Sequence, residues 1–401
     1  MNSKTDAAEH TTLGGTTTPS AQGPLHGIRI VEFAGVGPAP MAAMLLADLG
    51  ADVIRIDRLQ PSGLGIDKPK KFDLLARGRQ AVAIDLKHAD GVACALDLIA
   101  SADGLIEGFR PGVMERIGLG PDECFKRNPR LVFGRVTGWG QHGPLAPVAG
   151  HDLNYIALTG ALHAIGRAGE PPAPPLNLVG DYGGGALYLA FGMMCALVER
   201  QRSGRGQIVD AAMIDGAATL MTSLFGMIGA GIHNAPRGAN LLDSGAPHYE
   251  VYRCADGEYV AIAPIEEKFR TVLLERIGID PAEFPDVADR AHWPKAKAIL
   301  AETFAQRSRQ EWCELLEGSD ACFAPVLSAQ EAPDHPHNKA RRTFVEIDSV
   351  MQPAPGPRFS RTSPPLPRSS QQCRGDTGDL LAAWDIDSGR IATLRNAGII
   401  R

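Results

Sequence analysis

The feature that most constrains the fold is a strand, a break, a helix and a second strand in close succession. "GIRIVEF" (27–33) alternates like a strand, and "AGVGPAP" (34–40) interrupts it. "MAAMLLADLG" (41–50) then predicts a helix with a glycine stop, and "ADVIRID" (51–57) predicts another strand. Because strands joined through a helix run parallel, we expect a parallel sheet in an α/β fold.

The same alternation continues downstream. "QAVAIDL" (80–86) and "GLIEGF" (104–109) predict strands on either side of the helical "GVACALDLIASA" (91–102), and "RLVFGRVTG" (130–138) predicts one more strand. The first part of the chain is therefore typical of a Rossmann-like open α/β domain.

The glycines of "GVGPAP" suggest a dinucleotide site, with Asp57 near the usual position of the ribose-binding acid. The third glycine of that motif is Pro40 here, and proline lacks the N–H that a pyrophosphate needs. No G-x-S-x-G or P-loop occurs, and the histidines show no metal-ligand spacing. We therefore predict no redox cofactor and no metal.

The pattern changes beyond the first domain. "GALYLAFGMMCALVERQRSGRG" (185–206) and "DAAMIDGAATLMTSLFGMIGAGI" (210–232) predict long helices, and "EVYRCADGEYVAIAP" (250–264) predicts a hairpin turning at Asp256-Gly257. Further helices are expected over 267–277 and 293–317, then a Pro-, Ser- and Arg-rich extended connection after 330, and a last helix in "SGRIATLRNAGII" (388–400).

The bulk composition excludes some classes of protein. A net charge of -6 and a pI near 6.0 disfavour nucleic acid as a partner. The seven cysteines form no C-x-x-C pair, which favours reduced thiols and a cytoplasmic location. Residues 1–22 are polar and predict a disordered tail. The apolar stretches 184–198 and 211–232 are interrupted by polar residues, so we predict buried helices and no membrane insertion.

Two short stretches concentrate ionisable and glycine residues. "AGHDLNY" (149–155) places His151 beside Asp152 at the edge of an apolar run. This pair is either the capped start of a helix or a group that moves protons or attacks a substrate. "GDYGGG" (180–185) follows Asp181 with glycines, which allow close backbone approach or a flexible turn before a helix.

Several of these stretches together resemble the family III CoA-transferases (CaiB/BaiF) and, within them, the α-methylacyl-CoA racemases. The resemblance covers about residues 23–360. The matching stretches are "GPLHGIRIVEFAGVGPAPMAAMLLADLGADVIRIDR", "LIEGFRPGVMERIGLGP", "TGWGQHGP", "AGHDLNYIALTGALHAIGR", "PPLNLVGDYGGG", "ERQRSGRGQIVDAAM" and "GAPHYEVYRCADGEYVAI". "GHDLNYIALTG" together with "PPLNLVGDYGGG" is the part similar to the racemases.

The resemblance implies a large α/β domain and a small α/β domain in an interlocked homodimer. We accordingly expect five parts, namely a tail (1–22), a large CoA-binding domain (23–215), a linker helix (216–245), a small domain (246–330) and a return segment with a C-terminal helix that completes the large domain (331–401). It also implies an acyl-CoA thioester as substrate, so that coenzyme A belongs to the substrate and no separate cofactor is needed.

The chemistry implied is inversion at the carbon next to a thioester, through an enolate. Inversion needs an acid or base on each face of that carbon. His151 and Asp181 match the catalytic pair of the racemases, and Glu266 matches a carboxylate that supports the histidine from the other subunit, although Glu267 is adjacent. Asp152 leaves an alternative open, because in the family's transferases an aspartate here attacks the thioester and forms an anhydride. A third hypothesis is a non-catalytic acyl-CoA binder, which would not need the acid–base residues.

Cations of the α/β domain are the expected CoA-binding residues, because phosphates favour arginine and lysine. The set is Arg58, Arg77, Lys87, Arg110 and Arg116, of which Arg58 and Arg110 fit the family pattern best. Tyr155, Gly183 and Tyr249 are expected to contact the substrate. The methionines at 193, 194, 213, 221 and 227 either pack in the core or line the acyl chain, whose nature the sequence leaves open.

Overall fold

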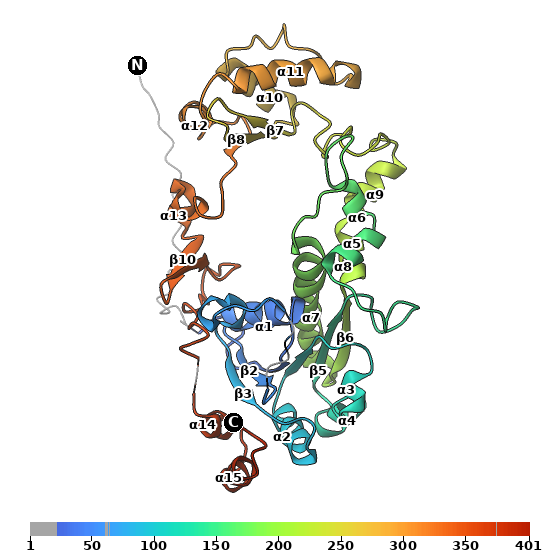
Figure 1. Cartoon of the computed structure of the whole chain (residues 1–401), viewed down its shortest axis with the longest axis vertical. Helices are drawn as coiled ribbons and strands as arrows, with labels where there is room; N and C mark the ends of the chain where they lie inside the picture. The colour runs from blue at the N-terminus through green and yellow to red at the C-terminus, as the bar shows by residue number, and fades with distance from the viewer. Residues whose placement is uncertain (1–21, 61–62, 64, 374) are drawn as a thin grey trace, which may run out of the picture.

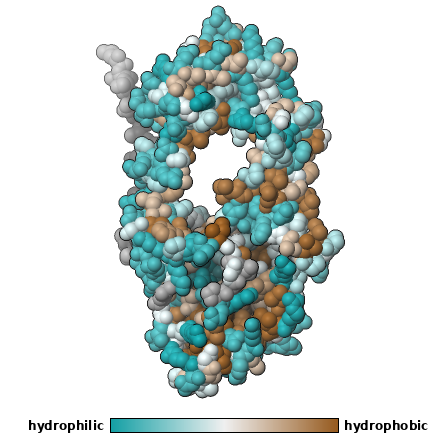
Figure 2. Space-filling view, in the orientation of Figure 1, coloured by the Kyte–Doolittle hydropathy of each residue, from teal (hydrophilic) through white to brown (hydrophobic). Residues whose placement is uncertain are grey.

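The chain forms a ring in the computed structural model, which describes residues 22–60, 63, 65–373 and 375–401. The predicted tail therefore lies outside the described residues, apart from its last position. In Figure 1 a large domain lies at the bottom and a small domain at the top, and two separate stretches of chain connect them. Figure 2 shows that side chains leave the central opening unfilled.

The large domain is built on the predicted parallel sheet. Its six strands run in the order β3-β2-β1-β4-β5-β6, and every neighbouring pair is parallel. The strands are β1 (Arg29–Phe33), β2 (Asp52–Asp57), β3 (Gln80–Ala83), β4 (Gly104–Glu107), β5 (Val132–Thr137) and β6 (Gln207–Ala212). The expected α/β fold is confirmed.

Apolar residues cover both faces of the sheet, as they do in most parallel sheets. Because side chains alternate along a strand, Val31 and Phe33 enter one core and Ile30 enters the other. The first core is closed by α2 (Ala89–Ala100), α3 (Val113–Arg116), α4 (Pro121–Arg127), α14 (Thr377–Ala383) and α15 (Ser388–Asn396). The second is closed chiefly by α1 (Pro38–Asp48) and α7 (Leu187–Ser203).

Two local predictions differ from the structure. Helix α1 begins at Pro38, inside the stretch expected to be a break, because proline fits the first turn, where no N–H partner is needed. Residues 210–212, expected to be helical, belong to β6, because pairing with β5 at the sheet edge outweighs local helix preference. The helix then continues as α8 (Met213–Leu220) and α9 (Thr222–Gly229).

The small domain packs helices on a three-stranded antiparallel sheet. The predicted hairpin is present as β7 (Glu250–Arg253) and β8 (Tyr259–Ile262), and β9 (Phe323–Pro325) pairs with β8. The helices are α10 (Glu267–Arg276), η4 (Arg290–His292), α11 (Trp293–Phe304) and α12 (Arg309–Leu316). The helical structure expected over 293–317 is present as two helices, since Ser308 caps the second one.

The return segment contains more regular structure than the extended connection expected after residue 330. It includes η5 (Ala332–Asp334), α13 (Pro336–Arg341) and a hairpin of β10 (Phe344–Ile347) with β11 (Val350–Pro353). Asp348 and Ser349 turn this hairpin with positive φ angles of 53° and 57°. The chain ends beside the large sheet, where Ile400 bridges Ile84 of the segment after β3.

One long apolar helix lies against the sheet. The continuous stretch Leu178–Ser203 is long and apolar enough to cross a membrane by length and composition. In the structure it packs on the sheet through Leu189, Met193 and Leu197. Of the methionines in question, 193 and 213 are buried in the core, and 194, 221 and 227 are half-buried.

Candidate functional site

The strand order places a topological switch point between β1 and β4. The connections after these two neighbouring strands lead in opposite directions, and in open α/β sheets ligands bind at the carboxyl ends of such strands. Gly37 follows β1 and caps α1, while Arg110 follows β4. Buried Glu107 shapes the second loop, because its Oε2 accepts the Phe109 N–H at 2.7 Å. We take this switch point as the frame of the site.

His151 lies at the N-terminus of α5 (Asp152–Leu158), with its side chain exposed. Its backbone N–H donates to Asn154 Oδ1 at 3.0 Å, which fixes the first turn of the helix. Both meanings of "AGHDLNY" are therefore compatible, because the backbone of His151 starts a helix while its imidazole stays accessible.

Asp152 connects the start of α5 to the glycine-rich segment. It is 5% exposed, and its Oδ2 accepts the N–H groups of Gly180 and Asp181, both at 2.7 Å. Its Oδ1 is buried and has no hydrogen-bond partner among the described residues. A Cβ on Gly180 would lie 2.7 Å from Asp152 Oδ2, so only glycine allows this approach. Asp152 thereby holds the backbone of Asp181.

Asp181 lies on η3 (Leu178–Ala186), a π-helical segment that runs into α7. Asn177 donates from Nδ2 to Asp181 Oδ2 at 3.3 Å. A Cβ on Gly37, whose φ is 73°, would lie 3.4 Å from the same oxygen, so Asp181 faces the N-terminus of α1. Wide helical turns of this kind are frequent at functional sites.

The electrostatics of Asp181 connect it to both residues of the pair. Burial raises the pKa of the Asp181 carboxyl, and the neighbouring Asp152 carboxylate raises it further. The Asn177 hydrogen bond and the charge of His151 oppose that rise. The raised pKa brings Asp181 toward the range in which a carboxyl group can both take and return a proton. The structure thus gathers His151, Asp152 and Asp181 at one place.

Tyr155 forms a wall of this site. Its hydroxyl donates to the Gly150 carbonyl, and its ring meets Trp139 edge-on at 4.8 Å between centroids. Burial raises the pKa of Tyr155 to about 12, with further contributions from Asp181 and Asp152. The phenol therefore stays protonated at neutral pH. The charge of the exposed Arg110 side chain lowers the same pKa.

The expected CoA-binding cations divide into two groups. Arg58, Lys87, Arg110 and Arg116 are exposed. Arg58 and Arg110 follow β2 and β4, the strands on either side of β1. Lys87 lies farther out, next to Asp85, whose N–H bonds to the Ile399 carbonyl of the C-terminal segment. The Arg116 side chain lies against the loop after β4. Its NH1 is 3.3 Å from the position that a Cβ on Gly112 would take.

Arg77 differs from the other four cations because it is buried and fully engaged. Its Nε and NH2 donate to Asp48 at 3.1 and 2.6 Å, and its NH1 donates to Gln352 Oε1 and the Pro353 carbonyl, both at 2.8 Å. These bonds tie α1 to the return hairpin and close the ring. This arrangement speaks against the prediction that Arg77 binds a CoA phosphate.

Two predicted site residues belong to the small domain. Glu266 is exposed at the N-terminus of α10, and Tyr249 is half-buried against Ala246 and Trp293. In Figure 1 the small domain, which carries α10, lies at the top of the ring, and α5 lies on its right-hand side. Among the described residues, no hydrogen bond or ion pair joins Glu266 to His151. Gly183, by contrast, lies on η3 itself, where a Cβ would lie 3.1 Å from Leu220 of α8.

Sequence reasoning missed Asn177 and Gly37. Asn177 stands four residues before Asp181, the spacing at which side chains meet on a helix, and this signal was present in "NLVGD". Gly37 was considered only as part of a dinucleotide motif. Among the described residues, no three His, Cys, Asp or Glu side chains group as metal ligands.

Comparison with known proteins shows the family of the chain. The model of "CoA-transferase family III" matches residues 25–372. The chain is 44% identical over 348 residues to the alpha-methylacyl-CoA racemase of Mus musculus, covering 86% of this chain and 89% of that protein. It is 42% identical over 346 residues to the Homo sapiens racemase, covering 86% and 88%.

Solved structures agree on the fold. The crystal structure of a CAIB/BAIF family protein from Brucella suis superposes with a TM-score of 0.74 at 25% identity, covering 87% of this chain and 96% of that chain. The chain belongs to CoA-transferase family III.

Proposed function

We propose that the protein is an α-methylacyl-CoA racemase that interconverts the (R) and (S) epimers of 2-methylacyl-CoA thioesters. One observation carries the proposal. His151 and Asp181 come from different helices, and Asp152, which directly follows His151 in the chain, accepts the Asp181 N–H at 2.7 Å, so the two groups lie close together. The two mammalian relatives named alpha-methylacyl-CoA racemase support it.

The proposed reaction is a proton exchange at the α-carbon. One of the two groups removes the α-proton and leaves an enolate, and the conjugate acid of the other returns a proton to the opposite face. The two groups thereby exchange protonation states, and the reverse reaction uses them in opposite roles. No electrons are transferred, so the reaction needs no redox cofactor. We propose that it also uses no metal, and coenzyme A enters as part of the substrate.

The alternative is an acyl-CoA:carboxylate CoA-transferase that uses Asp152 as a nucleophile. The geometry of Asp152 disfavours it. The carboxylate is 5% exposed, and two short backbone hydrogen bonds hold its Oδ2. Its Oδ1 has no partner among the described residues, but it is buried and would have to become accessible before it could attack a thioester.

We further propose that the active unit is an interlocked homodimer. The long helices and β6 leave many large apolar side chains exposed. Contiguous exposed apolar surface is typical of contact surfaces between proteins. The residues are Leu187, Phe191, Val198, Ile208, Leu220, Phe225, Ile228 and Ile232. Figure 2 shows apolar surface along the rim of the opening. A partner chain in the opening would cover this surface and bring its own Glu266 to His151. Light scattering during gel filtration measures the mass of this assembly.

The seven cysteines are all free, which suits the cytoplasmic location that we propose. We also propose that neither nucleic acid nor a membrane is a partner, because the net charge is -6 and the long apolar helix packs on the sheet.

The proposed function is tested by incubating the protein with one epimer of a 2-methylacyl-CoA in D₂O, with and without a free carboxylate. We expect deuterium at the α-carbon together with inversion, whether or not the carboxylate is present. Transfer of CoA to the carboxylate without α-exchange would overturn the proposal in favour of the transferase. Tight binding with neither reaction would favour a non-catalytic binder.

A further inference from the structure

The chain between the two proposed bases contains a stiff segment. After α6 (Ala161–Ala164), residues 165–177 read "IGRAGEPPAPPLN" and contain four prolines. The four prolines lie within 171–175, and proline-rich chain is extended and semi-rigid, so a displacement at one end of this part is transmitted to the other. The residues before it turn, with the Glu170 N–H donating to the Arg167 carbonyl at 3.4 Å. The segment ends at Leu176, whose φ of 57° is unusual for a bulky residue, and at Asn177, which bonds to Asp181. The position of this segment therefore bears directly on the Asp181 carboxylate.

The other end of the stiff segment is anchored to the small domain. Arg167 donates from NH2 and NH1 to the two oxygens of Glu250, at 2.9 and 3.0 Å. Glu250 is 7% exposed and begins β7. Its carboxylate also receives the Val251 N–H and the Lys297 ammonium, both at 2.7 Å. A two-pronged Arg–carboxylate pair fixes orientation as well as distance.

The charge state of Glu250 suits this anchor. Burial alone would raise the pKa of its carboxyl, but hydrogen bonds from Arg167, Lys297 and Val251 outweigh burial and hold the pKa below its ordinary value. Glu250 is therefore ionised at neutral pH and binds Arg167 through full charges.

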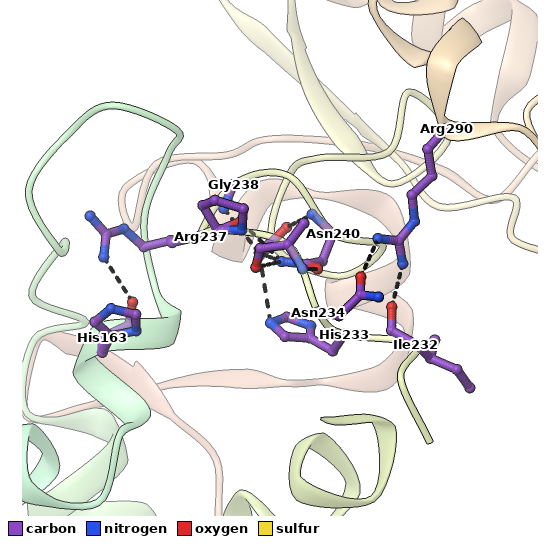
Figure 3. A network of polar contacts seen from close by, with 11 residues as sticks. His163, Ile232, His233, Asn234, Arg237, Gly238, Asn240 and Arg290 are labelled. Atoms are coloured by element: carbon purple, nitrogen blue, oxygen red, sulfur yellow. Dashed lines mark hydrogen bonds and ion pairs between the residues drawn. The ribbon is translucent and has the colours of Figure 1, made fainter. Parts of the chain in front are cut away.

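The linker between the domains holds the same segment from a second side, as Figure 3 shows. Arg237 donates to the carbonyls of His163 and Glu170, at either end of the loop that carries Arg167. The linker itself is rigid, because fully buried Asn240 donates to Asp243 at 2.8 Å and to the Ala235 and Pro236 carbonyls. From the small domain, Arg290 donates to Asn234 at 3.0 Å and to the Ile232 carbonyl.

We propose that Arg167 and Glu250 form a positioning pair that uses the small domain to hold Asp181 at its working distance from His151. The inference rests on the proposed function, since it concerns the distance between the two proton-transferring groups. Neither residue is placed at the reacting carbon. The pair acts through the proline segment and Asn177, and proton transfer is sensitive to displacements of about 1 Å.

Two variants that remove different partners of the same carboxylate separate positioning from stability. The Arg167 side chain is 57% exposed, so a methionine fits at this position without repacking a core. Arg167→Met leaves the Glu250 carboxylate paired with Lys297. Lys297→Met leaves Glu250 paired with Arg167 and therefore leaves the stiff segment anchored. We expect Arg167→Met to lower kcat for epimerisation about tenfold with KM changed less than about twofold, and Arg167→Lys to recover part of the loss. Lys297→Met should keep kcat within about twofold of the starting protein.

Hydrogen–deuterium exchange of the amides in 178–186 provides a readout that does not depend on turnover. We expect faster exchange in Arg167→Met and unchanged exchange in Lys297→Met. If both variants lower kcat equally, or if neither alters kcat nor amide exchange, the positioning pair is overturned. If the unsubstituted protein does not epimerise but Arg167→Met alone loosens 178–186, the proposed function fails while the structural coupling of Arg167 to the Asp181 segment stands.

Discussion

The two halves of the proposed site are built differently. Asp181 is held by contacts within one chain. Asn177 donates to its carboxylate, and the N–H groups of Gly180 and of Asp181 itself donate to Asp152. His151 is exposed, and its backbone N–H and carbonyl both bond to Asn154. The carboxylate expected to orient its imidazole lies on the small domain, across the opening of the ring. One half of the site is therefore held by contacts within the chain, whereas the other half depends on the dimer that we propose.

Among the variants that distinguish the His151 side of the site from the Asp181 side, we expect the largest loss of epimerisation from a change at Glu266. Glu266→Gln should lower epimerisation about 10²-fold, because an imidazole without its carboxylate is poorly oriented as a base. Turnover of a single-epimer substrate, followed by polarimetry or chiral chromatography, measures the loss.

Coexpression tests whether the partner subunit supplies this group. A chain with His151→Ala and a chain with Glu266→Gln should together form dimers in which one of the two sites combines an intact His151 with an intact Glu266. Such dimers should recover activity that neither variant has alone. No recovery, with mixed dimers verified by mass, would mean that Glu266 does not act across subunits. Glu267→Gln serves as the control for the adjacent carboxylate.

A smaller loss is expected from Asp152. Asp152→Asn keeps a hydrogen-bond acceptor for the amides of Gly180 and Asp181 but removes the charge, and we expect about a tenfold lower kcat together with about 1–2 kcal/mol lower stability. Complete loss of activity at unchanged stability would instead indicate a nucleophile. Denaturant unfolding alongside kinetics separates the two.

The same variant should shift the pH profile. The Asp152 carboxylate raises the pKa of Asp181, so removing this negative charge lowers that pKa. Asp181 must be ionised to accept a proton, and the acidic limb of kcat/KM should therefore move to lower pH in Asp152→Asn. A limb that stays in place would show that Asp181 does not govern it.

The smallest effects concern binding of the CoA moiety. Arg58→Ala and Arg110→Ala should each raise KM about tenfold, since each removes a charge available to a phosphate. Arg77→Met should leave KM unchanged but lower the melting temperature, because it strands the buried Asp48 carboxylate. A raised KM at unchanged stability for Arg77→Met would restore the prediction that it binds CoA.

Local patterns predicted the large sheet well. The strand–helix–strand units near residues 27–57 and 80–109 are strong because apolar periodicity, glycine stops and element length agree there. The edge strand β6 was missed, since only its pairing with β5 makes residues 207–212 extended. The β10–β11 hairpin was missed because Asp348 and Ser349 adopt positive φ angles that usually need glycine or asparagine.

The candidate site shows a similar division. The resemblance pointed to His151 and Asp181 as residues of one site, and this stays a prediction, although Asp152 beside His151 accepts the Asp181 N–H. The role of Arg77 could not be read from the sequence, because its partners Asp48 and Gln352 are distant along the chain. The anchoring of Arg167 by Glu250 likewise joins two domains and leaves no local pattern.

The most direct test of two bases on opposite faces is stereochemically resolved α-proton exchange in D₂O. The unsubstituted protein should exchange the α-proton of both epimers. His151→Ala should exchange that of one epimer only, and Asp181→Asn that of the other only, each without inversion, because a single base reaches a single face. If both variants lose exchange of the same epimer, or if either still inverts the centre at full rate, the two-base account is contradicted.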